Sequence, residues 1–413
     1  MPDAQPRQVV IAGAGVAGLT AALAFGERGY PVQLFEQAQR LEAIGAGLQL
    51  SPNATHILRQ LGVLDRLLAA AVRPEAVVLK DAATLRELGR VPLGQAAEQR
   101  WGAPYLVAHR ADLQSALTAR VAENPNIHLV TGARISGVAT GDHCVTATLE
   151  TDGKTVQSQG FLLVAADGVW STVRAVVDRT KGTASSRSRF SGELAWRTTV
   201  AADSAAGQAF AAVGATDCVT TFLHPGFHMV AYPVSKGDAF NLVAFTRGER
   251  IAEGWSGQAD PGILASAMRG TAAGLARLVE MAGPWLTWPL HTVDQKQPWT
   301  MPAGIALIGD AAHAMTPFAA QGAAMAIEDA ATLAASLAAF PTDPARALVV
   351  WEDLRRRRIT KVARRGGLNR LAWHAAGPVA IARNLFLKTR SADRLAADLD
   401  WLYGWQQQGI IRR

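Results

Sequence analysis

The sequence predicts an α/β fold in which helices cover a parallel sheet, a second lobe with a mainly antiparallel sheet is inserted, and C-terminal helices follow. Residues 8–37 read as strand, glycine-rich turn, helix and second strand. Residues 181–296 change to short strands with alternating apolar positions, and residues 346–413 are mainly helical in pattern. A chain of 413 residues is long for one core, so two lobes are expected.

Composition and cysteine content limit the class of protein. Apolar residues make up 49% of the chain and charged residues 18%, as in a globular protein. No stretch of about 18 residues is free of charge and proline, and no signal peptide is apparent, so we expect no membrane span. Cys144 and Cys218 are far apart, which excludes a CxxC dithiol or a cysteine metal site and favours a reducing, cytoplasmic location.

The net charge of +7 raises the question of a nucleic-acid partner. The basic residues are mostly dispersed, and no basic patch is interleaved with aromatic residues, so we expect none. The densest basic run, LRRRRITKVARR at residues 354–365, is interpreted as a solvated helix face. Docking of an anionic cofactor or partner on this run is the alternative.

The glycine-rich segment at residues 8–37 has a specific physical meaning. Gly13, Gly15 and Gly18 have the spacing GxGxxG between a short apolar strand and an apolar helix. The first glycine allows a tight turn, the second lets the backbone approach a pyrophosphate, and the third lets the helix pack closely on the strand. Glu36 ends the next strand, where a carboxylate binds ribose hydroxyls. The segment predicts a dinucleotide site.

Two later strands end in similar turns. The apolar strand within residues 161–174 ends at Asp167, and the strand within residues 304–313 ends at Asp310. The carboxyl ends of parallel strands meet at one sheet edge, where α/β proteins bind ligands. We therefore expect both turns to lie beside the glycine-rich turn.

Three segments, GAGVAGLT, AADGVWSTVR and GDAAHAMTPFAAQGAAMAIEDA, occur in this order. They resemble the motifs of the FAD-dependent single-component aromatic hydroxylases, the group of salicylate, hydroxybenzoate and hydroxynicotinate hydroxylases. ELAWR, HPGFHMVAYPV and DWLYGW extend the resemblance along essentially the whole chain. It implies a Rossmann-like FAD-binding domain of residues 1–180 and 297–345, a substrate-binding lobe of residues 181–296 and a helical region of residues 346–413. Ala314 departs from the proline that is common in the third motif.

The resemblance also implies which residues hold the cofactor. Glu36 and Arg110 would bind the ADP half of FAD together with the glycine turn, and Asp310 would bond the ribitol or the pyrophosphate. The helix amides at Gly322 would face the flavin ring, and Asp167 resembles a motif implicated in FAD and NAD(P)H binding. The implied cofactor-binding residues are Gly13, Gly15, Ala17, Gly18, Glu36, Arg110, Asp167, Asp310, Gly322 and Ala323.

The segment FLHPGFHMVAYPV predicts the substrate side of the site. Strand alternation puts His228, Val230 and Tyr232 on one face. The resemblance implies that His228 and Tyr232 are catalytic and contact the substrate, with Gln49 and Pro317 beside them. A purely structural histidine is the alternative for His228.

Further residues near these segments allow other interpretations. A turn separates His224 from His228 and no carboxylate lies nearby, so we expect no metal. Arg197 is a candidate to bind a substrate carboxylate, with a structural salt bridge as the alternative. Trp285 and Trp288 differ in spacing from the tryptophan pair of flavin-dependent halogenases and are interpreted as core residues.

The resemblance implies an NAD(P)H-consuming monooxygenase that hydroxylates a phenolic or hydroxypyridine aromatic, expected to be a carboxylic acid, through a flavin C4a-hydroperoxide. NADH or NADPH would be a transient co-substrate, since the chain has one dinucleotide fingerprint, and O2 the other. A phenolate reacts better than a phenol, so a base with a pKa near neutrality is useful, and His228 is the candidate. A flavin oxidase or dehydrogenase and a catalytically silent flavin-binding protein are the alternatives. We expect a monomer or homodimer.

Overall fold

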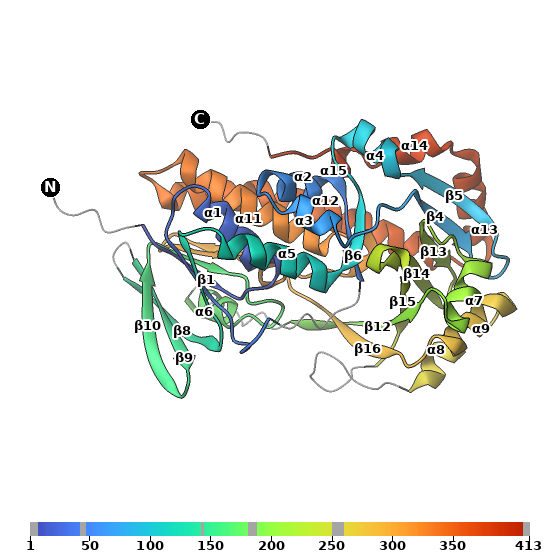
Figure 1. Ribbon diagram of the computed structural model, residues 1–413, viewed down its shortest axis with the longest axis horizontal. Coiled ribbons are helices and arrows are strands. Elements are labelled where there is room, and N and C mark those ends of the chain that lie inside the picture. Colours follow the sequence, from blue (N-terminus) through green and yellow to red (C-terminus); the bar gives the residue numbers. More distant parts are fainter. Residues whose placement is uncertain (1–6, 42–46, 142–143, 181–187, 250–259, 408–413) are drawn as a thin grey trace.

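The computed structural model describes residues 7–41, 47–141, 144–180, 188–249 and 260–407. The molecule is elongated, with a six-stranded sheet toward one end and a seven-stranded sheet toward the other (Figure 1). The six-stranded sheet is parallel except for its edge strand β17. Its order is β17 (Thr300–Met301), β18 (Ile305–Leu307), β11 (Leu162–Ala165), β1 (Val9–Ala12), β2 (Val32–Phe35) and β7 (Ile127–Val130). The predicted parallel sheet is confirmed.

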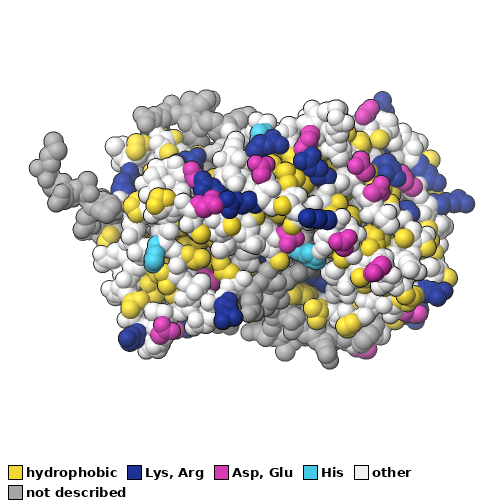
Figure 2. All heavy atoms as spheres, viewed as in Figure 1, with side chains coloured by type: hydrophobic (Ala, Val, Ile, Leu, Met, Phe, Trp, Pro, Cys, Tyr) yellow, Lys and Arg dark blue, Asp and Glu magenta, His cyan; other side chains and the backbone are white. Residues whose placement is uncertain are grey.

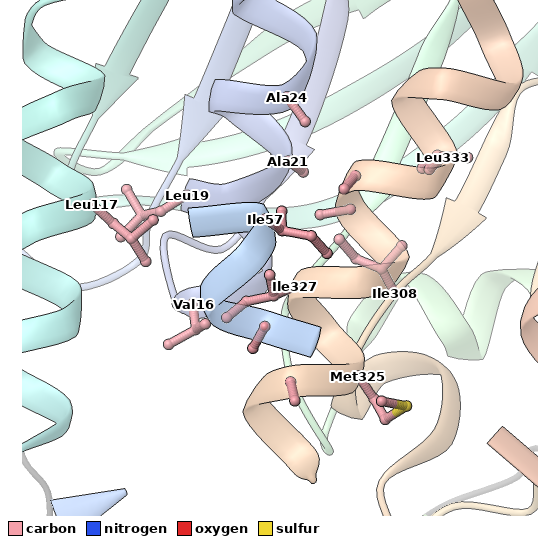
Figure 3. Close-up of a cluster of buried hydrophobic side chains, with 14 of the residues drawn as sticks. Val16, Leu19, Ala21, Ala24, Ile57, Leu117, Ile308, Met325, Ile327 and Leu333 are labelled. Carbon is pink, nitrogen blue, oxygen red and sulfur yellow. The ribbon is translucent and has the colours of Figure 1, made fainter. Parts of the chain in front are cut away.

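Small residues let the helices on this sheet approach closely. The first helix, α1 (Val16–Gly26), is buried along nearly its whole length. It packs against α5 (Arg110–Ala122) and the alanine-rich α11 (Gly322–Ala339), which in turn contacts α2 (Pro52–Gln60). Figure 3 shows Leu19 of α1 against Leu117 of α5, with Ile57 of α2 and Ile327 of α11 in the same apolar cluster.

The seven-stranded sheet is mainly antiparallel, as expected for the inserted lobe. Its order is β16 (Leu286–Thr292), β12 (Arg189–Ala201), β15 (Ala239–Arg247), β14 (Phe227–Val234), β13 (Val219–Leu223), β4 (Ala76–Asp81) and β5 (Glu87–Pro92). One face packs against α7 (Ala205–Val213), α8 (Pro261–Ala267) and α9 (Ala273–Met281). The strands β4 and β5 come from a part of the chain far before the others. The domain boundaries stay a prediction, and the one at residue 181 lies outside the described residues.

Smaller elements complete the mixed α/β class. A three-stranded antiparallel sheet projects beside the six-stranded sheet (Figure 1), and β3 pairs with β6. Over the described ranges, every helix falls short of the length and apolar character that a bilayer crossing requires. The remaining elements are β3 (Gly47–Leu50), α3 (Leu64–Leu68), α4 (Gly94–Trp101), β6 (Leu106–His109), β8 (Ala133–Gly141), β9 (Cys144–Thr151), β10 (Lys154–Gly160), α6 (Thr172–Thr180), η1 (Ser235–Gly237), α10 (Asp310–His313) and η2 (Pro317–Ala319).

The predicted C-terminal helices are also confirmed. They are α12 (Pro344–Trp373), α13 (Gly377–Thr389), α14 (Ala392–Ala397) and α15 (Asp400–Tyr403). The longest of them, α12, lies along α11 (Figure 1). Between these two helices the structure buries charge.

A buried ionic cluster joins α11 to α12. The Arg355 guanidinium contacts Glu328 and Asp329 at 2.6 Å each, and Arg358 contacts Glu328 at 2.8 Å. His313 completes the cluster through Nε2, which lies 2.6 Å from Asp329 Oδ2. Both carboxylates are fully buried. Charges at this depth are tolerated because every one of them faces an opposite charge.

The interpretation of residues 354–365 as a solvated helix face is therefore wrong for two of its arginines. Arg355 and Arg358 are three residues apart, so both lie on the face of α12 that packs on α11. The interpretation holds for Arg357, whose side chain is 77% exposed. Elsewhere the basic side chains are interspersed with acidic ones on the face that Figure 2 shows.

Candidate active site

A cavity of about 510 Å³ lies between the glycine turn after β1 and the inner face of the seven-stranded sheet. It unites segments that are far apart in the sequence. The predicted site residues that line it are Gly15, Ala17, Gln49, Arg110, His228, Tyr232, Asp310, Pro317, Gly322 and Ala323. Gly13, Gly18, Glu36 and Asp167 do not line it.

The alternation of strand side chains produces the apolar wall of this cavity. Across β12, β15, β14 and β13, one row of paired residues lines the cavity: Arg197, Val243, Val230 and Thr221. The next row faces the opposite side and is buried in the core beneath α7, α8 and α9: Trp196, Ala244, Met229 and Phe222. A sheet with both faces covered thus carries a core on one side and a binding site on the other.

The glycine turn has the shape that a pyrophosphate needs. A Cβ on Gly18 would lie 1.8 Å from the carbonyl oxygen of Gly13, so the turn and α1 are in close contact. Gly13 has φ +93° and faces the backbone of Ala166 and Asp167, in the turn after β11. A Cβ on Gly15 would meet no atom within 4 Å, and this glycine opens onto the cavity at the N-terminus of α1. The residues present therefore fit a dinucleotide at this position.

Glu36 lies behind this turn, at the end of β2. Its carboxylate accepts hydrogen bonds from the backbone N–H of Ala14 at 2.8 Å and of Ala38 at 2.9 Å. A carboxylate has about four acceptor positions, so it keeps capacity for a sugar hydroxyl.

The turn after β18 is held by the buried ionic cluster. Gly309 adopts φ +57° and donates its N–H to Asp329 Oδ2 at 2.9 Å. Asp310 follows it, is exposed, and lines the cavity. The helix α11 begins at Gly322, where a Cβ would again meet no atom within 4 Å. The turn and the start of α11 thus border the same space.

Asp167 is placed differently. Its carboxylate accepts hydrogen bonds from the N–H groups of Thr172 at 2.9 Å and Val173 at 3.3 Å, at the start of α6. Burial raises its pKa. The neighbouring Ala166 and Gly168 line the cavity instead. Asp167 therefore shapes the turn after β11 from behind.

His228 is the most enclosed polar side chain on the substrate side. It is 1% exposed, and its ring stacks on Phe245 with 4.5 Å between centroids. Its Nδ1 lies 3.0 Å from Nε2 of His374. Burial, and then the charge of His374, hold the pKa of His228 well below the usual 6.5. The structure therefore gives a neutral imidazole rather than the near-neutral pKa that was expected.

Two other polar groups face the cavity beside it. Burial raises the pKa of Tyr232 far above its usual value, so this phenol stays protonated. The Gln49 side chain accepts a hydrogen bond from the Tyr105 hydroxyl at 2.7 Å. Pro317 begins the short helix η2 at the cavity wall.

Arg197 lies on the cavity face with its guanidinium 5.4 Å from the centroid of the Trp288 ring. Its Nε is buried and lacks a hydrogen-bond partner within the described parts of the chain. Burial lowers the pKa of Arg197, which means that its charge is poorly solvated. Trp285 and Trp288 both pack on the hydrophobic core, as interpreted, and Trp288 also lines the cavity.

Sequence reasoning missed several cavity residues. Tyr105 and Trp373 line the cavity, and His374 supports His228 from behind. Trp288 carried a weak signal, because alternation along WLTWPL puts it and Trp285 on opposite faces. In the structure it pairs with Ala195 of β12. His374 carried none, because its partner lies 146 residues away in the sequence.

We expect acid to destabilise the fold through His228. Below pH 6.5 the histidine of the unfolded chain is protonated, whereas His228 in the native protein stays neutral. The free energy of unfolding that is present above pH 6.5 therefore decreases as the pH falls. A difference of one bound proton lowers the free energy of unfolding by about 1.4 kcal/mol for each pH unit. Urea unfolding at pH 7.5 and 5.5 should show a smaller loss for His228→Asn than for the wild type. The variant His128→Asn, at an exposed position, should keep the wild-type loss; equal losses in all three proteins would contradict this role of His228.

Comparison with known proteins agrees with this geometry. The model of the FAD binding domain family matches residues 7–365. The 3-hydroxybenzoate 6-hydroxylase of Polaromonas naphthalenivorans is 31% identical over 96% of both chains. The 3-amino-4-hydroxybenzoate 2-monooxygenase of Streptomyces cremeus is 33% identical over 96% of this chain and 95% of that protein. A salicylate hydroxylase in complex with its substrate shares the fold, with a TM-score of 0.81 at 24% identity over 97% of this chain and 96% of that chain.

These similarities confirm the resemblance that the three motifs carried. They also confirm FAD as cofactor and NAD(P)H as co-substrate, and they support neither a flavin oxidase nor a silent flavin-binding protein. The protein is a flavin-dependent aromatic monooxygenase. The chain belongs to the family of FAD-dependent aromatic hydroxylases.

Proposed function

We propose that this enzyme hydroxylates an aromatic ring, phenolic or hydroxypyridine, that also carries a carboxylate, with O2 as the oxygen source. The observation that carries the proposal is that Arg197 and His228 lie on the same apolar face of the sheet, and that both line the cavity. The two residues are two strands and two positions apart, roughly 12 Å between Cα atoms. Their side chains and one small aromatic acid between them span that distance.

The cofactor would lie along the other wall. The glycine turn, Gly13, Gly15, Ala17 and Gly18, would hold the pyrophosphate with Arg110, and Glu36 would bind the ribose. Asp310 would bond the ribitol or pyrophosphate, and the amides at Gly322 and Ala323 would face the flavin. Asp167 would act by fixing the turn that presents Ala166 and Gly168. FAD bound by these residues would supply the redox chemistry, taking hydride from NAD(P)H and activating O2 for transfer to the substrate.

The protein's own side chains would prepare the substrate. His228, whose Nδ1 is taken by His374, would accept the substrate's hydroxyl proton at Nε2. The phenolate so formed is richer in electrons at the ring carbon to be hydroxylated. Tyr232 would donate a hydrogen bond, Gln49 and Pro317 would bound the ring, and Val230 and Val243 would exclude water.

The test is oxidation of NADH and NADPH by the FAD-loaded protein across hydroxylated benzoates and pyridine carboxylates, with product mass recorded. We expect stimulation by at least one acid together with a product heavier by one oxygen atom. Stimulation of peroxide release alone across the whole panel would contradict the proposed substrate class. A second panel of larger aromatic compounds would then be used to identify the substrate class.

Replacing Arg197 by methionine is expected to lower kcat/KM for the aromatic acid by about 10- to 100-fold, since a charge-assisted hydrogen bond contributes about 1.5–3 kcal/mol. The corresponding phenol without a carboxyl group should lose much less. Arg189→Met, at an exposed position on the same strand, is the matched control. An equal loss for acid and phenol would mean that Arg197 does not bind the carboxylate.

A further inference from the structure

Aromatic rings enclose His228, and within the described residues its hydrogen-bonding contact is with His374. Its ring contacts Phe245, Phe318 and Trp373, with centroids 4.5 to 5.0 Å apart. These apolar rings offer a proton no acceptor. One nitrogen, Nδ1, faces His374, which does not line the cavity, whereas the His228 ring itself does.

His374 comes from a distant part of the chain and is closer to solvent. It follows the last residue of α12 and is half-buried. The end of α12 is anchored there by Arg383, whose Nη1 donates to the carbonyl oxygens of Ala372 and Trp373 at 2.8 and 3.4 Å. The 3.0 Å approach of the two imidazoles is thus fixed by the packing of two helices.

We propose that His374 is a positioning residue of the active site, which sets the tautomer of His228 and relays the substrate's proton from it toward solvent. The inference rests on the proposed function, in which His228 takes the hydroxyl proton.

The transfer is balanced in protons. The substrate O–H bond breaks as N–H forms at Nε2 of His228, and Nδ1–H of His228 breaks as N–H forms at Nε2 of His374. The Nδ1 proton of His374 then leaves to solvent. Each ring gains one proton and releases one, so neither remains charged inside the apolar wall. Without His374 the ring could accept the proton only by becoming a buried cation.

The charges around His374 favour this neutral exchange. Arg370 on α12, Arg247 at the end of β15 and His224 in the turn before β14 all face it. Burial first, and then these groups, lower the pKa of His374 to about 4. Arg370 is itself paired with Glu193, 2.7 Å away. A proton that arrives at His374 is therefore passed on.

The test compares His374→Phe, which cannot relay, and His374→Gln, which keeps a hydrogen-bonding group but cannot pass a proton. His128→Gln, at an exposed histidine that does not line the cavity, is the control. The first readout needs no turnover: the pKa of a bound nitrophenol carboxylate, followed by its phenolate absorbance. We expect that pKa to rise by about one unit or more in both His374 variants and to stay unchanged in His128→Gln.

The second readout is kcat against pH with the substrate that the panel identifies. We expect kcat at neutral pH to fall by about tenfold or more in both His374 variants, with KM changed by less than about threefold. Added imidazole should restore part of the rate to His374→Ala, which a merely structural role would not allow. Wild-type kcat and wild-type phenol pKa in the His374 variants would overturn the relay. If the wild type ionises the bound phenol but hydroxylates nothing in the panel, the proposed function fails while the relay stands.

Discussion

Replacing Arg355 by methionine is expected to lower the free energy of unfolding by about 3–5 kcal/mol. The substitution removes the cation shared by Glu328 and Asp329, both fully buried. Two carboxylates would then face each other with one guanidinium, Arg358, and His313. Urea unfolding followed by circular dichroism measures the change.

The matched control lies two residues further along the same helix. Arg357 pairs with Asp353 at the surface and is 77% exposed, so Arg357→Met is expected to change the free energy by less than about 1 kcal/mol. Similar losses in the two variants would show that burial of charge is not what stabilises this helix pair. Because Asp329 also holds the N–H of Gly309, Arg355→Met should weaken FAD binding as well.

The second large effect is expected in the glycine turn. Gly18→Ala would put a Cβ 1.8 Å from the carbonyl oxygen of Gly13, and neither backbone can move without separating α1 from the sheet. We expect little folded protein to accumulate. The measurement is the yield of soluble protein and its thermal unfolding temperature without FAD.

Gly15→Ala is the informative partner of this variant. Its Cβ would meet no protein atom within 4 Å and its φ of −75° suits alanine, so the unliganded fold should unfold at the wild-type temperature. The added methyl would enter the cavity where a pyrophosphate approaches the backbone. FAD titration by fluorescence should therefore show an affinity lower by about tenfold or more. If Gly15→Ala binds FAD with the wild-type affinity, the pyrophosphate does not approach the backbone at Gly15.

The parts of the site that could be predicted from the sequence are local in origin. The glycine turn depends on contacts within a few residues of Gly13, and strand alternation alone puts His228 and Tyr232 on one face. The hydrogen bonds of Asp167 to the start of α6 are also local, although the sequence analysis assigned this residue to the cofactor and did not predict them.

The remaining features depend on packing between distant segments. Whether an arginine of α12 is buried depends on where the carboxylates of α11 lie, so the run at residues 354–365 looks uniformly exposed by itself. Glu328 and Asp329 within an apolar helix were the missed signal, because buried carboxylates require cations. The contact of His228 with His374 joins the seven-stranded sheet to the C-terminal helices, and no local pattern encodes it.

The strand order of the six-stranded sheet has a consequence for synthesis on the ribosome. Its strand β18 pairs with β11, which pairs with β1, yet β18 emerges only after about three quarters of the chain has been made. The arginines that neutralise Glu328 and Asp329 emerge later still. A nascent chain therefore carries four of the six strands, with the β11 edge unpaired, until β18 emerges, and its buried acids lack their arginines until later still. Such long-range pairing is slow. Because Asp310 and Gly322 border the cavity, we expect the chain to bind FAD only after these late segments have been made.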